Sequence, residues 1–250
     1  VDHLKVAGPQ SLLYSVEALF FVEALCIVHY SLEISLHIVA GALGLSLGVV
    51  PMFARKGGRI HKLIGRLFVF SASVVMLSAI IAIVCHDKSN FTSLSRITLT
   101  SSYLLWSAFR ALKLKATGPQ RLDILVALCA FMLSLPLYFQ SAAHSSVPVA
   151  LSNFTLYWLW TVLAYDISRH WWKSSLSPKL AQIEHGIKMI AVYFAMLSAG
   201  AGNVLSSFRP WSIVLPNAIG MITMTGIALY YAHLHRQEAR VQREGAARAA

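Results

Sequence analysis

Apolar runs of about 20 residues alternate with short polar loops along almost the whole chain. A helix of that length matches the ~30 Å hydrocarbon core of a bilayer, because an α-helix rises about 1.5 Å per residue. The pattern predicts one transmembrane domain over 1–250, an all-α polytopic bundle of eight spans. The expected spans cover residues 11–29, 32–54, 63–85, 93–112, 122–143, 149–168, 183–205 and 211–232.

The first run has a second interpretation, because it contains Glu17 and Glu23. Each acid at mid-membrane costs about 2.5 to 3.5 kcal/mol on insertion scales. Residues 11–29 are therefore either an extra N-terminal span or an interfacial helix, which would leave seven spans. An internal similarity favours the crossing: the third and seventh runs begin with a histidine, in IHKLIGRLFVFSAS and IEHGIKMIAVYFAM. With eight helices, this similarity predicts a pseudo-repeat of two parallel halves of four.

Lysine and arginine gather in every second loop, which predicts the orientation of the chain. Short loops rich in these residues remain in the cytoplasm. We therefore expect a cytoplasmic C-terminus with a basic tail over 236–250. The basic residues of the expected cytoplasmic side are Arg55, Lys56, Arg59, Lys62, Arg66, Arg110, Lys113, Lys115, Arg121, Arg169, Lys173, Lys179, Lys188, Arg236, Arg240, Arg243 and Arg248.

The composition agrees with the prediction of a membrane protein. With 57% hydrophobic residues, 12% charged residues and a mean hydropathy of +0.63, the chain is far more apolar than a typical soluble domain. The net charge of +11 follows the loops and shows no aromatic-interleaved basic stripe, so no nucleic-acid partner is expected. The three cysteines, Cys26, Cys85 and Cys129, form no CxxC pair, and no metal site is expected.

Small residues mark one expected packing surface. Gly41, Gly44 and Gly48 lie on one stripe of the second expected helix. Such a stripe lets a neighbouring backbone approach closely, so it predicts helix packing.

Among the ten histidines, five that lie at ends of the expected helices suggest a cofactor. His61 and His185 open two helices on the inner side, and His37, His86 and His144 lie at outer ends. A bis-imidazole haem needs two histidines from different helices at matching depth. His61 with His185, or His37 with His86 or His144, meets that condition. The alternative is that these histidines hydrogen-bond to headgroups, water or loop backbone at the interface.

The densest polar cluster is RKGGRIHKLIGR, residues 55–66. Gly57 and Gly58 allow a tight turn between two spans, and Arg59, His61 and Arg66 can face one pocket in the inner leaflet. The pocket would suit an anionic headgroup, a quinone oxygen or a haem propionate. The alternative is that the cluster only orients the chain by its positive charge.

Carboxylates give a further hypothesis. Glu17 and Glu23 would face the bundle interior and lie on a proton or cation path if their segment spans the membrane. Nearer the cytoplasmic boundary, acids are expected to pair with bases as anchors, in the pairs Asp123 with Arg121, Asp166 with Arg169, and Glu184 with Lys188. No GxSxG, HExxH, Walker loop or dinucleotide fingerprint is present, so catalytic residues stay unknown and enzyme activity stays open.

The segment HIVAGALGLSLGVVPMFARKGGRIHKLIGRLFVFSASVVMLSA resembles a family of uncharacterised bacterial integral membrane proteins with an HIxAG helix and a KGGRxHRxxGR loop. The looser later matches are WSAFRALK, EHGIKMIAVYFA and LPNAIG, so the resemblance covers about residues 32–232. Matching positions are His37, Ala40, Gly41, Lys56, Gly57, Gly58, Arg59, His61, Gly65, Arg66, Trp106, Arg110, His185, Met189, Tyr193, Pro216 and Gly220. The resemblance implies a helix bundle in the bacterial cytoplasmic (inner) membrane and supplies no activity.

Three functions remain open at this stage. The first is a redox membrane protein with b-haem or quinone held by His61, His185, Arg59 and Arg66 inside, and by His37 with His86 or His144 outside. The second is a proton-coupled small-solute transporter. The third is a non-catalytic accessory subunit that packs in a larger membrane complex. In each case membrane lipid is a partner, and other membrane subunits are candidates.

Overall fold

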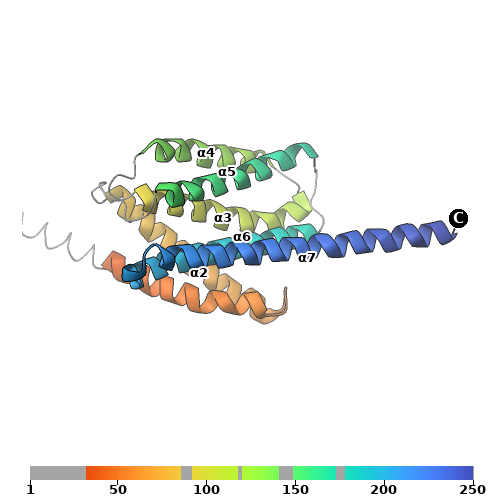
Figure 1. Ribbon diagram of the computed structural model, residues 1–250, viewed down its shortest axis with the longest axis horizontal. Helices are drawn as coiled ribbons and strands as arrows, with labels where there is room; N and C mark the ends of the chain where they lie inside the picture. Colours follow the sequence, from red (N-terminus) through yellow and green to blue (C-terminus); the bar gives the residue numbers. More distant parts are fainter. Residues whose placement is uncertain (1–31, 86–91, 118–119, 141–148, 173–177, 250) are drawn as a thin grey trace, which may run out of the picture.

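The computed structural model describes residues 32–85, 92–117, 120–140, 149–172 and 178–249. They form seven α-helices and one short 3-10 turn, with no strand in these ranges (Figure 1). The all-α prediction is confirmed, and each predicted run from residue 32 onward lies on a helix; the run over 11–29 lies outside the described residues. The elements are Leu32–Phe53, α2 (Arg59–Cys85), α3 (Thr92–Thr117), α4 (Arg121–Phe139), α5 (Val149–Trp172), α6 (Pro178–Val204), η2 (Ser206–Phe208) and α7 (Trp211–Ala249).

Five of these helices are long and apolar enough to cross a membrane. Large apolar side chains stand exposed on them, among them Phe70 and Ile222, which are 69% and 73% exposed. So much exposed apolar surface is unfavourable in water and is suited to hydrocarbon. The chain is therefore a multi-pass integral membrane protein. Its membrane-length segments are Leu32–Phe53, Arg59–Cys85, Arg121–Phe139, Leu180–Val204 and Trp211–Tyr231.

α3 and α5 do not reach the apolarity of a membrane span, so length and apolarity support five of the predicted eight spans. The physical reason is clearest for α3, which packs against α2, α4, α5 and α6 in the centre of the bundle. A helix surrounded by other helices can carry polar groups that lipid would not tolerate. The buried polar residues of α3 are Arg96, Thr98, Thr100, Ser101 and Ser107.

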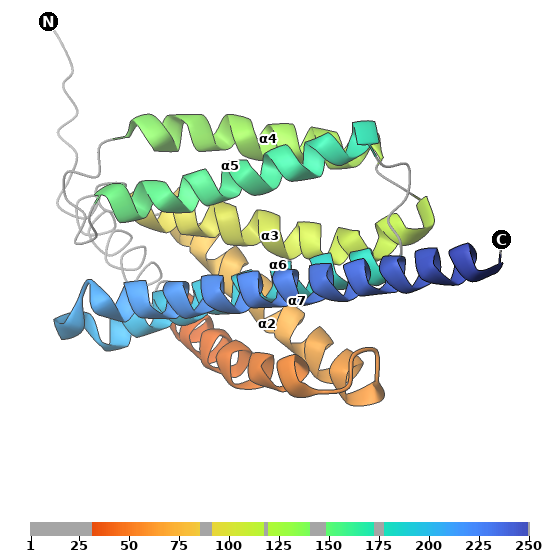
Figure 2. The ribbon, with the colours of Figure 1, turned by 45° about the vertical axis from the view of Figure 1, so that its right-hand side comes forward.

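The bundle is organised around α3 and α6, which pack along each other. α7 packs on the other side of α6, and α4 packs on α5. In both ribbon views α3 and α6 lie between α5 and α7 (Figures 1 and 2). α5 makes no extensive packing contact with α6 or α7 among the described residues.

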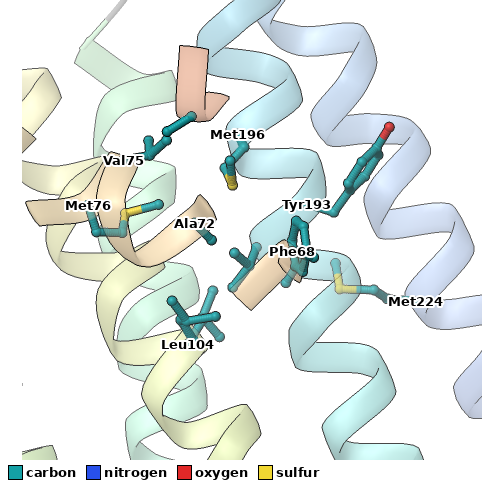
Figure 3. Packing of buried hydrophobic residues seen from close by; sticks show 12 residues of the cluster. Phe68, Ala72, Val75, Met76, Leu104, Tyr193, Met196 and Met224 are labelled. Atoms are coloured by element: carbon teal, nitrogen blue, oxygen red, sulfur yellow. The ribbon is translucent and has the colours of Figure 1, made fainter. Parts of the chain in front are cut away.

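An apolar cluster joins α2, α3, α6 and α7 (Figure 3). Phe68 of α2 lies beside Tyr193 of α6, with their ring centroids 6.3 Å apart, and Ala72 of α2 belongs to the same cluster. Leu104 and Val192, each at most 2% exposed, close the cluster. This cluster fixes α6 against its neighbours, which matters because α6 carries charged residues described below.

The predicted glycine stripe is a packing surface. A Cβ atom on Gly48 would lie 2.7 Å from Tyr193 Cδ2 and 2.8 Å from Phe68 Cδ2. One on Gly44 would lie 2.9 Å from Met196 Cε. At Gly48, where the neighbours are the rings of Tyr193 and Phe68, glycine lets helix Leu32–Phe53 approach α2 and α6 this closely.

The lysine- and arginine-rich loops end up together. The turn between Phe53 and Arg59, the α3 and α5 C-termini, and the starts of α4 and α6 lie at one end of the bundle (Figures 1 and 2). α7 projects beyond the bundle from the same end. In the first turn Gly57 has φ +77°, as the tight-turn prediction requires, and Lys56 Nζ donates to the Pro51 and Met52 carbonyl oxygens at 2.8 and 2.6 Å.

Candidate functional site

Four charged side chains form a closed ring between α5 and α6. Arg169 Nη2 lies 2.6 Å from Asp166 Oδ1, and Arg169 Nη1 lies 2.7 Å from Glu184 Oε1. Lys188 Nζ closes the ring at 2.7 Å from both Asp166 Oδ1 and Glu184 Oε1. The four residues are 3% to 7% exposed, so the network lies inside the protein. We call these residues the ion ring.

Local helix geometry prepares the ring. Asp166 and Arg169 are three residues apart on α5, and Glu184 and Lys188 are four apart on α6, so each pair lies on one helix face. The two predicted pairings are confirmed as contacts. Their setting differs from the prediction, because they are buried and joined across two helices instead of anchoring the chain separately at the interface.

α3 completes the surroundings of Asp166. The Tyr103 hydroxyl donates to Asp166 Oδ2 at 2.8 Å, and the Ser107 hydroxyl donates to the same atom at 2.6 Å. Lys188 also donates to Ser107 Oγ at 2.6 Å. Two positive and two negative groups give the ring no net charge, and each has charged partners to offset its removal from water.

A second ion pair lies nearer the loop end. Arg110 of α3 donates through Nε and Nη2 to the two carboxylate oxygens of Asp123, at 2.7 and 2.9 Å. Asp123 also accepts from the Gln120 backbone N–H at 2.8 Å and so caps the first turn of α4. The predicted pairing of Asp123 with Arg121 is therefore wrong: the guanidinium comes from the preceding helix, and Arg121 is exposed.

Two cavities lie along the bundle. The outer cavity, of about 440 Å³, is lined by α3, α5, α6, α7 and the turn before α7, and the inner cavity, of about 350 Å³, is lined by α3, α5 and α6. Leu104, Trp158 and Ala191 line both, so the two cavities are neighbours on either side of these residues. Glu184 and Lys188 line the inner cavity, so the ion ring borders that cavity.

The structure places the predicted histidines with defined partners. His61 Nδ1 lies 3.2 Å from the Pro51 carbonyl oxygen, and His185 Nδ1 lies 2.9 Å from the Ala108 carbonyl oxygen. Because a carbonyl only accepts, each Nδ1 carries the proton. His61 is also close enough to His185 to act on it electrostatically.

The other predicted site residues are not gathered with these two. His37 Nδ1 hydrogen-bonds to Ser78 Oγ at 2.8 Å, near the opposite end of α2. Arg59 and Arg66 are exposed at the start of α2, and neither borders the two cavities. His86 and His144 lie outside the described residues. No histidine in the described ranges lines either cavity.

The ion ring shows what sequence reasoning missed. The i to i+3 and i to i+4 spacings indicated two local pairs, but no sequence signal gives the register that brings α5 and α6 face to face. The part of the chain that the structure describes contains no group of three histidine, cysteine or acidic residues able to hold a metal ion.

The chain matches no family model, no curated protein and no solved structure. No family is therefore identified, and the site is interpreted from its own geometry.

Proposed function

We propose that the protein is a proton-coupled transporter of a small solute, with the ion ring as its proton-binding element. The observation that carries this proposal is that Glu184 and Lys188 border the inner cavity, which is separated from the outer cavity by the shared lining residues Leu104, Trp158 and Ala191. Ionisable residues inside membrane bundles are unfavourable unless paired, and they mark ion and proton paths in transporters.

The chemistry follows from the partners of Glu184. Its carboxylate pairs with Arg169 of α5 and Lys188 of its own helix, and Tyr165 of α5 lines the same inner cavity. Asp166 and, through it, Tyr103 of α3 complete the surroundings. A proton that enters by the inner cavity and binds a Glu184 oxygen removes one of the two negative charges that hold Arg169 and Lys188, and leaves Asp166 to hold both. The Arg169–Glu184 bridge from α5 to α6 is then lost while the Asp166–Lys188 bridge stays, so the link between the two helices is weakened and the inner cavity opens.

The proposal moves the proton path from Glu17 and Glu23 to Glu184 and Asp166. The first two acids lie outside the described residues. Glu184 and Asp166 accept hydrogen bonds from donors on three helices. A proton that binds either carboxylate therefore weakens contacts between these helices.

Cysteine accessibility tests this coupling. In a chain without native cysteines, Ile187→Cys reports on the inner cavity and Ser101→Cys on the outer one. Lowering the pH should increase the reaction of the inner cysteine with a membrane-impermeant thiol reagent and decrease that of the outer one. Glu184→Gln should abolish both responses. Accessibility that does not depend on pH in either reporter would overturn the proposal.

A second function, b-haem binding by His61 and His185, is favoured by one observation. Each Nδ1 is bonded to a backbone carbonyl, which leaves Nε2 to face a metal, as in many histidine ligands. Against it, neither described cavity is lined by these histidines. Protein expressed with ample haem should show a Soret band that His61→Ala and His185→Ala both remove; a colourless preparation excludes this function. No described contact favours the accessory-subunit alternative or a quinone.

We also propose a topology for the transporter. The end that carries the basic loops faces the cytoplasm of a bacterium, and the protein lies in its inner membrane. α3 and α5 cross with the five apolar helices because each packs alongside them. The eighth span over 11–29, the parallel halves of four and the membership of the uncharacterised family remain part of this proposal.

A further inference from the structure

The outer cavity has a buried floor and an exposed apolar rim. Ser101, Leu104 and Ser198 line the floor and are at most 2% exposed, whereas Phe154 of α5 and Met221 of α7 are 42% and 38% exposed. Met221 lies at the middle of the membrane-length segment Trp211–Tyr231. The exposed rim residues come from α5 and α7, so the cavity opens between these helices toward the hydrocarbon of the bilayer.

The polar lining favours a ligand that brings oxygen acceptors. Thr100 is 4% exposed, lines the cavity, and its hydroxyl has no hydrogen-bond partner in the protein. A buried hydroxyl without a partner is unfavourable unless a ligand or water satisfies it. On the α6 and α7 wall, by contrast, Asn217 Nδ2 donates to Ser198 Oγ at 2.8 Å, and Ser198 donates to the Ile213 carbonyl at 2.9 Å, so these donors are satisfied within the protein.

The charged side chain that lines the outer cavity favours an anionic ligand. Arg209 lies at the outer end of the cavity, where its Nε donates to the Gly202 carbonyl at 2.8 Å. It is the one ionisable residue among the described residues that line this cavity, and no carboxylate is present there to receive a cation. Most of the remaining lining is apolar or small, and Ile97, Trp158 and Phe194 contribute apolar side chains from three helices.

We infer that the outer cavity binds a single-chain amphipathic anion that enters from the bilayer. Its head lies near Arg209 and its apolar body lies along Ile97, Phe194 and Trp158. A volume of about 440 Å³ is adequate for such a molecule. The inference deepens the proposed function, on which it rests, by naming the substrate class.

Three probes with the same chain and different heads test the class: decanesulfonate, decanol and decyltrimethylammonium. Binding is measured calorimetrically to the full chain in nanodiscs of zwitterionic lipid, with empty nanodiscs subtracted. Decanesulfonate should bind at least about tenfold more tightly than decyltrimethylammonium, because a charge-assisted hydrogen bond distinguishes them. Equal affinities for the two charged probes would overturn the inference.

Two substitutions locate the site. Arg209→Gln should reduce the affinity for decanesulfonate by about tenfold, and leave that for decanol unchanged. Thr100→Val, which keeps the side-chain shape, should reduce the affinity for decanesulfonate by about fivefold. The matched controls are Arg121→Gln and Thr223→Val, which border neither cavity and should change nothing. If Arg209→Gln does not fold, Thr100→Val decides alone, and unchanged affinity in that variant contradicts the inference.

The two proposals fail separately. Selective binding of decanesulfonate together with pH-independent cysteine accessibility would contradict the transporter proposal and support the anion-binding site. Cysteine accessibility that depends on pH, without selective binding of decanesulfonate, would support the transporter proposal and contradict the inferred substrate class.

Discussion

The Arg169 guanidinium donates two hydrogen bonds through Nη1 to the Glu184 carboxylate, at 2.7 and 2.9 Å, across from α5 to α6. These helices have little other packing with each other, so this pair and the Lys188 bridge form the main described link between them. A link made of charges can be released by a proton, whereas an apolar interface cannot. This relation gives the ion ring its proposed role.

Lys188→Met should destabilise the protein strongly. It leaves Asp166 and Glu184 buried with one guanidinium between them, and breaking such a network costs about 3 kcal/mol or more. Lys62→Met, on the exposed start of α2, should cost less than about 0.5 kcal/mol. Unfolding by SDS titration in mixed micelles measures both. Similar midpoints for the two variants would show that the ring contributes no stability.

Removing one positive and one negative charge of the ion ring together should destabilise the protein less than removing either charge alone. The double variant Arg169→Met with Glu184→Leu leaves the Asp166–Lys188 pair intact at 2.7 Å. We expect a favourable coupling of about 2 kcal/mol between the two substitutions in a double-mutant cycle. Additive effects would mean that the two residues do not act as a pair.

The glycine stripe predicts a contrast between identical substitutions. Gly48→Ala should destabilise by about 1 to 3 kcal/mol, because its Cβ would lie 2.7 Å from Tyr193. Gly186→Ala on α6 meets no atom within 4 Å and should be neutral or stabilising by up to about 1 kcal/mol. Thermal unfolding followed by helix circular dichroism separates them. Equal effects would show that Gly48 is not a packing contact.

The turn between the first two described helices gives another test. Gly57 has φ +77°, so Gly57→Ala should cost about 1 to 2 kcal/mol through backbone strain alone. Gly65→Ala, in the regular helix α2, has open space around it and serves as the control. The same unfolding measurement applies, and a stabilised Gly57→Ala would contradict the turn geometry.

Reporter fusions test the orientation. Fusions at Gly57 and at Gln120 should report the same compartment, because the turn between Phe53 and Arg59 and the start of α4 both lie at the end from which α7 projects (Figures 1 and 2). A fusion after Gln140 should report the opposite one, since α4 runs from that end to the other. Activity of the reporters at Gly57 and Gln120 in different compartments would refute the topology.

The positions of the helices could be predicted from the sequence, because a lipid bilayer requires each spanning helix to have a minimum length and an apolar surface. Runs such as 32–54 and 63–85 lie on helices that end within a few residues of the prediction. α3 shows the limit of hydropathy, since Ser101 and Ser107 face protein and not lipid. α4 ends at Phe139 rather than residue 143, and the carbonyls of Leu137 and Gln140 there accept hydrogen bonds from Arg96 of α3.

The site was harder to predict, because it depends on which helices face one another. Asp166 and Arg169 are close in sequence, but their contact with Glu184 and Lys188 needs the register of α5 against α6. Arg110 and Asp123 show the same effect, since the nearer base, Arg121, is not the partner. Burial of a charge is a tertiary property, so a charge near a predicted boundary gave no indication that it lay inside.

The unbroken course of α7 from Trp211 to Ala249 has a mechanical consequence. Past Tyr231 it continues for 18 residues, which at helical rise makes a rod of about 27 Å outside the bilayer. A small tilt of its membrane part against α6 would therefore be magnified into a sweep of several ångströms at the far tip. A fluorophore or spin label at Ala249 would act as a pointer for motions too small to follow within the membrane.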